Sequence, residues 1–200
     1  MILQRLRSET ASHHAAIESQ MPLLDPELSR QTYIHLLQRF WGYYSPLEQR
    51  LRSQSFEGRY LWSDREKTPR LISDLLALGA TTTGLARCEN LPCLDSTAKI
   101  LGCLYVIEGA SLGGQIIAKH LDANLGLTPE TGASFFSGYG VSTGPYWLAF
   151  RTFLSEFAAS LNQDDQIVVS ANATFQTLGD WLSQDQATLL KHSLATNSAI

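Results

Sequence analysis

The feature that most constrains the fold of this chain is a long apolar segment in its middle, from about Asp95 to Asn124. Apolar residues recur in it at intervals of three and four, which is typical of one long helix with a buried face. Glycines stand inside this segment at positions 102, 109, 113 and 114, although each costs about 1 kcal/mol relative to alanine in a helix. Two interpretations stay open: close packing of a second helix, or a backbone that is kinked at Gly109 and Gly113 and lies against a flat ligand.

Most of the remaining sequence has helical periodicity as well. A β-like run occurs only at Gln166–Ser170, and it is too short and isolated to form a sheet. Helices are predicted at about residues 2–20, 29–53, 67–78, 95–124, 145–161 and 163–190, with loops at about 80–90 and 126–144. The sequence therefore predicts an all-α fold, a single-domain helical bundle over residues 1–190 with a flexible C-terminal tail at 191–200.

Composition and charge exclude several classes of protein. Lys and Arg number 15 against 19 Asp and Glu, and this net charge of −4 argues against a nucleic-acid binder. We expect no membrane span, because no run of about 18 apolar residues occurs, and the N-terminus does not read as a signal peptide. The three cysteines, Cys88, Cys93 and Cys103, fit neither a zinc site nor a disulfide framework. We therefore expect reduced thiols and a cytoplasmic protein.

The first predicted helix contains the best candidate for metal ligation. His14 lies on its apolar stripe, whereas His13 lies about 100° away on the more polar side. Glu18 follows His14 by one turn and can influence the orientation and basicity of the imidazole. A histidine on an apolar face is more often a core residue than a ligand, so both interpretations stay open. No Glu-x-x-His pair accompanies it, and a di-iron carboxylate site is therefore unsupported.

A histidine that faces a glycine-containing helix suggests haem, whose iron takes one proximal imidazole and leaves the opposite side open. The propionates of haem need cations at its edge. Arg7, two turns before His14, and Arg151, on a later helix, are the candidates. Glu108 lies within the apolar segment and needs a partner or polar surroundings, because a buried unpaired carboxylate is costly.

At these residues the chain resembles the haem oxygenase family, and the resemblance covers most of its length. The first helix resembles the family's proximal helix through Leu6-Arg7-Ser-Glu-Thr10-x-x-x-His14-x-x-x-Glu18. The central segment resembles its glycine-hinged distal helix through Leu101-Gly-x-Leu-Tyr-Val-x-Glu-Gly109-x-x-Leu-Gly113-Gly114. Two later motifs, Phe136-x-Gly138-Tyr-Gly140 and Trp147-x-x-Phe-Arg151, resemble the bacterial branch, which includes enzymes that supply biliverdin to bacterial phytochromes.

The resemblance implies a role for each matched residue on the two helices. His14 would be the axial ligand of the haem iron, with Glu18 supporting it. Gly109 and Gly113 would lie against the distal face of the haem, and Gly114 would complete the hinge.

The resemblance also implies the surroundings of the haem. Leu23 and Phe175 match positions that line the haem pocket, and Arg7 and Arg151 match basic positions that meet the propionates. One turn before Arg151 the family usually has another basic residue, whereas this chain has Trp147. We therefore expect the propionate clamp to be thinner or built differently.

Ala110 is the main departure from the family pattern. The animal and cyanobacterial enzymes have an aspartate directly after the first hinge glycine, where it organises the distal water network, and some bacterial members lack it. Glu108 is a poor substitute, because it points about 200° around the helix from Ala110. The sequence therefore leaves the route of proton delivery unassigned.

The resemblance implies an enzyme that cleaves haem to biliverdin and releases iron and carbon monoxide. Haem would be both substrate and cofactor, O2 the oxidant, and a ferredoxin- or reductase-like partner the electron donor, since the chain has no flavin or Fe–S motif. A bilin-accepting phytochrome is a further expected partner.

Three alternatives remain at this stage. The first is a haem- or tetrapyrrole-binding protein of the same fold without turnover, which the absence of an acid at Ala110 favours. The second is a thiaminase-like hydrolase that uses Cys103 near Glu108. The third is a helical interaction module without a ligand.

Overall fold

The computed structural model describes residues 1–56, 62 and 64–184, and this part of the chain contains helices but no β-strand. The predicted all-α fold is confirmed. Its α-helices are α1 (Ile2–Glu9), α2 (Ala11–Gln20), α3 (Arg30–Ser53), α4 (Thr68–Ala77), α5 (Thr97–Leu125), α6 (Ser134–Ser137), α7 (Thr143–Leu161) and α8 (Asp164–Ser183). Two short helical turns, η2 (Pro129–Ala133) and η3 (Gly140–Ser142), flank α6.

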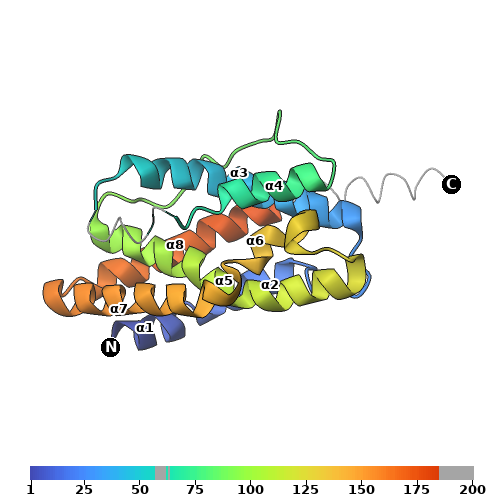
Figure 1. Ribbon diagram of the computed structural model, residues 1–200. Coiled ribbons are helices and arrows are strands. Elements are labelled where there is room, and N and C mark those ends of the chain that lie inside the picture. The colour runs from blue at the N-terminus through green and yellow to red at the C-terminus, as the bar shows by residue number, and fades with distance from the viewer. Residues whose placement is uncertain (57–61, 63, 185–200) are drawn as a thin grey trace.

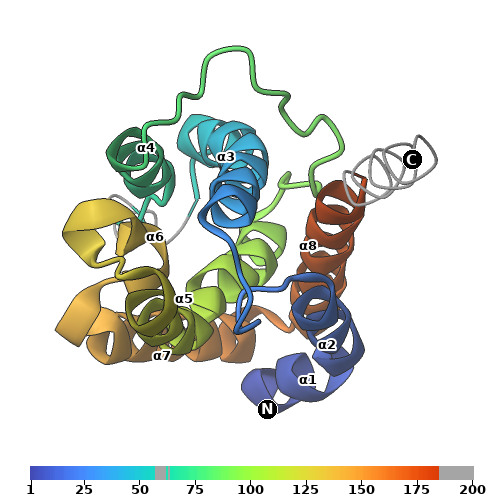
Figure 2. The ribbon, with the colours of Figure 1, turned by 90° about the vertical axis from the view of Figure 1, so that its right-hand side faces the viewer.

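The long helix α5 runs through the bundle, with α8 packed along it. The N-terminal helices α1 and α2 also pack against α8, and α3 pairs with α4 on another side (Figure 1). Figure 2 shows α2 and α5 on opposite sides of the lower part of the molecule, with α3 above them. The proximal and distal helices expected from the sequence therefore lie across from each other.

The predicted first helix, Ile2–Gln20, is in fact two helices that meet at Thr10. The backbone there has φ −106° and ψ −2°, outside ideal helical values. Thr10 is buried, and its hydroxyl donates to the Leu6 carbonyl oxygen over 2.7 Å. Such back-bonding by a threonine bends a helix, and so α2 takes a direction of its own.

The other predicted boundaries agree with the structure to within a few residues, with one exception. The stretch expected as a loop at 126–144 contains η2, α6 and η3, and α7 begins within it. Gln166–Ser170, the β-like run that was expected not to form a sheet, lies inside α8, within the range of the predicted last helix. The last helix is described to Ser183, and both the predicted end at 190 and the tail at 191–200 lie outside the described residues.

A single hydrophobic core extends from Ile2 to Leu182. Helix α5 passes through it and is long and apolar enough to cross a membrane by length and composition alone. More than half of its most apolar stretch is buried inside the protein (56%), as expected of a core helix. It is the one helix of this kind in the described ranges.

Candidate haem site

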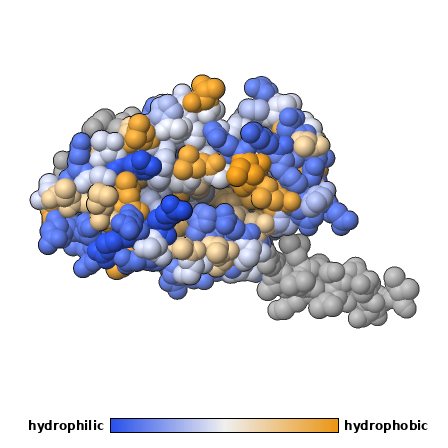
Figure 3. Space-filling model, turned by 90° about the horizontal axis from the view of Figure 1, so that it is seen from below, coloured by the Kyte–Doolittle hydropathy of each residue, from blue (hydrophilic) through white to orange (hydrophobic). Residues whose placement is uncertain are grey.

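A cavity of about 560 Å³ lies between α2 and α5, within the range of about 300–1,000 Å³ that is usual for small-molecule and cofactor sites. Residues of α1, α2, α3, α5, α6, α7 and α8 line it, together with Lys67. Most are apolar or aromatic. Figure 3 shows the molecule from below, where apolar side chains gather right of the centre.

His14 lies in the α2 wall of this cavity. Its side chain is 55% exposed, so it is not a buried core histidine. The ring nitrogen Nδ1 lies 3.3 Å from Glu18 Oε2, and the ring meets Phe175 edge-on with 5.7 Å between centroids. A carboxylate at Nδ1 fixes the ring and leaves Nε2 available, which is the arrangement of a metal-ligating imidazole with its supporting group.

His13 has a different environment. Its Nδ1 lies 2.8 Å from the Asn172 side-chain oxygen on α8, and it is not among the residues that line the cavity. The two adjacent histidines thus face different sides of α2, as the helical spacing predicts.

The four glycines of α5 divide into two pairs. A Cβ atom on Gly102 would come within 2.2 Å of the Ile167 carbonyl oxygen on α8, and one on Gly114 within 2.6 Å of the Phe136 carbonyl oxygen. These two glycines allow close packing. A Cβ on Gly109 would meet the Trp147 ring at an ordinary 3.7 Å, and one on Gly113 would meet no atom within 4 Å.

Packing therefore does not account for Gly109 and Gly113, which both line the cavity. Without side chains, they leave the α5 backbone open along one wall, opposite His14. Close helix packing is thus confirmed for Gly102 and Gly114. The contact of Gly109 and Gly113 with a flat ligand stays a prediction, and Gly114 lines the cavity as well.

Aromatic side chains form the remaining walls. Phe40 and Tyr44 come from α3, Phe135 and Phe136 from α6, and Trp147 from α7. The short helix α6 is held in place by the buried carboxylate of Asp74, whose pKa is raised by burial. Asp74 accepts hydrogen bonds from the Ser134 hydroxyl and from two main-chain N–H groups at the start of α6, at 2.7 to 2.8 Å.

The remaining site residues predicted from the sequence lie in different places. Arg7, Glu18 and Phe175 line the cavity, whereas Leu23 and Arg151 do not. Leu23 is buried in the hydrophobic core.

Arg7 lies close enough to Tyr105 on α5 to affect its ionisation. Burial raises the pKa of Tyr105, and the positive charge of Arg7 opposes this rise. Trp147, at the position where a basic residue was expected from the resemblance, lines the cavity beside Gly109.

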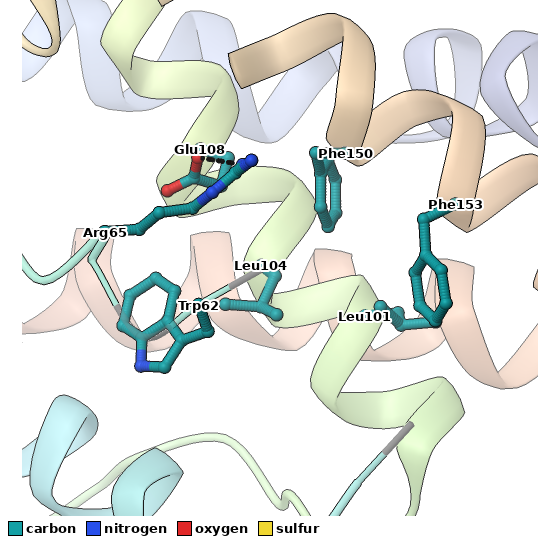
Figure 4. A pocket seen from close by; sticks show the side chains of 7 residues that line it. All are labelled: Trp62, Arg65, Leu101, Leu104, Glu108, Phe150 and Phe153. Atoms are coloured by element: carbon teal, nitrogen blue, oxygen red, sulfur yellow. Dashed lines mark hydrogen bonds and ion pairs between the residues drawn. The ribbon is translucent and has the colours of Figure 1, made fainter. Parts of the chain in front are cut away.

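Glu108 does not line this cavity. It lies in a buried polar network at a separate, small pocket, where Figure 4 shows its carboxylate beside Arg65. Its carboxylate accepts hydrogen bonds from Arg65 at 2.9 Å, from Lys67 at 2.7 Å and from the Tyr139 hydroxyl at 2.8 Å. Glu108 was expected to need a partner, and these three residues are its partners. Because its carboxylate is bonded to them, Glu108 does not take the place of an acid at Ala110, as expected. Of these four residues, only Lys67 also lines the cavity.

The residues around the cavity fit a haem molecule. One wall offers an exposed imidazole with a supporting carboxylate, and the opposite wall offers open backbone at Gly109 and Gly113. Apolar and aromatic side chains surround the space, and Arg7 supplies a cation for an acidic edge. Within the described residues no group of three His, Cys, Asp or Glu side chains is placed to hold a bare metal ion.

The cysteine alternative has little support in the structure. Cys103 is fully buried, and burial raises the pKa of its thiol to about 12. A nucleophilic cysteine requires the opposite shift. Burial also raises the pKa of Cys88, whereas Cys93 is exposed.

We expect one fast-reacting thiol in the folded protein. An exposed thiol reaches its thiolate form far more readily than a buried one, so a chromogenic disulfide reagent should modify Cys93 first. Cys88 and Cys103 should react only after denaturation. A Cys93→Ser variant gives the control, since it should show no fast phase. Rapid modification of Cys103 in the folded protein would reopen the hydrolase alternative.

Comparison with known proteins shows the family of this chain. The family model for heme oxygenase matches residues 1–184. A search of curated proteins finds no match to this chain. Among solved structures, the fold is similar to that of the heme oxygenase from Neisseria meningitidis, described in its NO- and CO-bound forms. The TM-score is 0.76 at 19% identity, over 92% of this chain and 91% of that one.

A second similar structure is the heme oxygenase from Leptospira interrogans. Its TM-score is 0.70 at 19% identity, over 92% of this chain and 98% of the other. At such identities these structures show a shared fold, while the family model spans nearly all of the sequence. Together with the cavity between α2 and α5, this match establishes that the chain belongs to the haem oxygenase family and is an enzyme of that type.

Proposed function

We propose that this enzyme opens haem to biliverdin, with release of iron and carbon monoxide, and that His14 is the axial ligand of the iron. The observation that carries the proposal is the placement of an exposed imidazole, in contact with a carboxylate, across one cavity from the open backbone of α5. The bound haem supplies the iron centre that binds and activates O2. The protein contributes orientation, polarity and control of water.

On the proximal side, α2 presents His14 and Glu18 one turn apart. Glu18 Oε2 lies close enough to Nδ1 to accept its proton in a hydrogen bond and hold the ring in one tautomer. Phe175 limits rotation of the ring from the α8 side. A thiolate ligand pushes electron density toward the iron and favours cleavage of the O–O bond. A neutral imidazole such as that of His14 does not have this effect.

On the distal side, Gly109 and Gly113 let the α5 backbone approach the ring plane, and Gly114 keeps α5 close to α6. The aromatic side chains of α3, α6 and α7 line the cavity and would limit the access of bulk water to bound haem. The α5 backbone at Gly109 and Gly113 would thus shape the space beside the haem in which O2 binds. Which edge of the porphyrin is presented depends on how the propionates are seated.

Arg7 and Arg151 are the cations proposed to seat the propionates. We expect Arg7→Glu to change the ratio of biliverdin isomers and to weaken haem binding, because a carboxylate beside a propionate is repulsive. Arg151→Glu should have the smaller effect, since Arg151 does not line the cavity. Chromatography of the bilin products from both variants tests this, and an unchanged isomer and affinity in Arg7→Glu would remove Arg7 from the site.

Three further parts of the proposal concern the cellular context. Electrons come from an external ferredoxin- or reductase-like donor. The product passes to a bilin-accepting phytochrome, and the enzyme works in the cytoplasm. The external donor rests on the resemblance and on the absence of flavin and Fe–S motifs from the sequence, and the phytochrome rests on the resemblance to the bacterial branch. The cytoplasmic location rests on the three cysteines, which fit neither a disulfide framework nor a zinc site.

A second candidate is a protein that binds haem without turnover, which the absence of an acid at Ala110 favours. The deciding experiment reduces the haem-loaded protein in air and follows its visible spectrum. Loss of the Soret band, growth of a broad red absorbance, and biliverdin, iron and carbon monoxide in the products would support oxygenase activity. A stable haem complex under the same conditions would favour the binding protein.

A further inference from the structure

Asp74 on α4 is a buried carboxylate to which the proposed function assigns no role. Only 1% of it is exposed. The ion pairs within the described part of the chain do not include it. Arg70, one turn before it on α4, favours its charged form through the electric field alone. Burying a carboxylate without a paired cation is costly, so hydrogen bonds must offset the cost.

These hydrogen bonds come from the start of α6, 60 residues later in the chain. Asp74 Oδ1 accepts from the main-chain N–H of Ser134 at 2.8 Å and from its hydroxyl at 2.7 Å. Asp74 Oδ2 accepts from the main-chain N–H of Phe135 at 2.7 Å. Hydrogen bonds to an ionised group are stronger than those between neutral groups. The carboxylate therefore fixes the start of α6 relative to α4.

Phe135 links this carboxylate directly to the cavity. Its N–H is held by Asp74, whereas its ring lines the cavity. The ring packs against Phe40 and Tyr44 of α3, with 5.3 and 5.5 Å between centroids, and against Phe136 at 4.9 Å. All three of these aromatic neighbours line the same cavity. The position of one main-chain N–H group thus determines how an aromatic wall is packed.

Helix α6 also supports the α5 wall of the cavity. The carbonyl oxygen of Phe136 is the atom that a Cβ on Gly114 would approach to 2.6 Å, so the two helices meet there backbone to backbone. Gly114 and its neighbour Gly113 both line the cavity. Figure 2 shows α6 beside α5, with α4 above it. A displacement of α6 would therefore alter the aromatic wall and the α5 wall together.

The chain that leads into α6 has a second attachment. The Tyr33 hydroxyl on α3 donates to the Gly132 carbonyl oxygen at 2.8 Å. Gly132 has φ 127°, a backbone conformation that favours glycine, and a Cβ there would come within 2.8 Å of the Leu78 side chain. Because this attachment does not involve Asp74, loss of the carboxylate should shift α6 without unfolding the segment.

We propose that Asp74 is a positioning residue for haem, which acts through the main chain of Phe135 on the aromatic and α5 walls of the cavity. The inference rests on the proposed function, in which haem binds in this cavity. Asp74 does not itself line the cavity, so it acts on haem only through α6. Its carboxylate determines how closely the walls fit the haem and how polar the space beside the iron is.

Asp74→Asn is the sharpest test, because it keeps the size of the side chain and removes its charge. An asparagine has one acceptor oxygen and one NH2 group. If the oxygen keeps its bonds to Ser134, the NH2 group faces the N–H of Phe135, and two donors then oppose each other. The start of α6 should therefore move or loosen.

Three measurements follow this change, and none of them depends on turnover. In the haem-free protein, the Phe135 amide should exchange its hydrogen with solvent about tenfold faster. Haem affinity should fall about tenfold, because the walls lose their fit. In the ferrous haem complex with carbon monoxide, the C–O stretching band should shift or broaden, since this vibration responds to charges and dipoles beside the iron.

Two control variants separate positioning from a general loss of stability. Gly102→Ala disturbs the contact of α5 with α8, yet Gly102 does not line the cavity. It should lower the melting temperature and leave haem affinity and the C–O band unchanged at a temperature where all variants are folded. Ser134→Ala removes one of the three bonds to Asp74, so it should weaken haem binding by a smaller factor, about threefold.

A double-mutant cycle tests the route through Phe135. Phe135→Leu removes the ring that packs on Phe40 and Tyr44. If Asp74 acts through this residue, Asp74→Asn should weaken haem binding much less in a Phe135→Leu protein than in the parent. Effects on affinity that simply add would contradict the route.

An Asp74→Asn protein with the parent haem affinity and C–O band would overturn the proposal and leave Asp74 a structural residue, as would an unchanged exchange rate at Phe135. If Asp74→Asn does not fold, Ser134→Ala decides by the same measurements, and parent values in that variant would overturn the proposal. A parent protein that binds haem without degrading it would contradict the oxygenase function alone, so the two failures can be told apart.

Discussion

Replacing His14 by alanine should lower the affinity for ferric haem by at least tenfold, about 1.4 kcal/mol, and abolish the Soret spectrum of a histidine complex. The reason is that His14 is the imidazole in the cavity wall that faces the backbone of α5. The fold should survive, because the His14 side chain is more than half exposed and contributes little to the core. Haem titration followed by absorption, with a thermal melt of the haem-free variant, measures both effects.

His13→Ala is the matched control, since it removes the same side chain from the neighbouring position. His13 contacts Asn172 on α8 outside the cavity, so its loss should leave the haem spectrum unchanged. Added imidazole should restore an axial ligand to His14→Ala and leave His13→Ala unaffected. A normal histidine spectrum in His14→Ala, or its loss in His13→Ala, would assign the ligand to another residue.

The second large effect is expected at Gly113. A Gly113→Leu side chain has room in the haem-free protein, because a Cβ at this position meets no atom within 4 Å. Replacing a helix-interior glycine also favours the helix by roughly 0.5–1 kcal/mol. The leucine, however, would occupy the space beside the open α5 backbone. We therefore expect a chain of equal or higher thermal stability that binds haem at least tenfold more weakly, about 1.4 kcal/mol.

Gly102→Ala is the contrasting variant on the same helix. Its Cβ would come within 2.2 Å of the Ile167 carbonyl oxygen, a main-chain atom that cannot move aside. Overpacking of this kind costs about 1–3 kcal/mol, so the melting temperature should fall although the cavity is untouched. If Gly113→Leu bound haem normally, or if it destabilised the fold as Gly102→Ala does, the assignment of the α5 wall would be wrong.

Periodicity alone predicted most of the fold, because apolar side chains at intervals of three and four identify a buried helix face. It did not predict the break at Thr10, since the hydrogen bonds on either side continue and only a local side-chain bond to Leu6 bends the chain. It also assigned too little structure to residues 126–144. There, η2, α6 and η3 are held by contacts distant in sequence, such as the bonds from Asp74 to the start of α6.

The sequence predicted the candidate site only where the residues concerned lie on one helix, because their relative directions then follow from helical spacing. The choice of His14 over His13 follows from helical angle, but the division of the α5 glycines into a packing pair and a cavity pair depends on which helices lie beside each residue. The partners of Glu108 come from the segment before α4 and from Tyr139, far from it in sequence. No local pattern marks Lys67 as a cavity residue. Leu23 and Arg151, which were inferred from family position, do not line the cavity.

The most direct test of the central claim is a crystal structure of the protein with ferric haem. The account predicts iron bound to Nε2 of His14, the ring plane beneath Gly109 and Gly113, and the propionates toward Arg7. Haem bound elsewhere, or ligated by a residue other than His14, would contradict it.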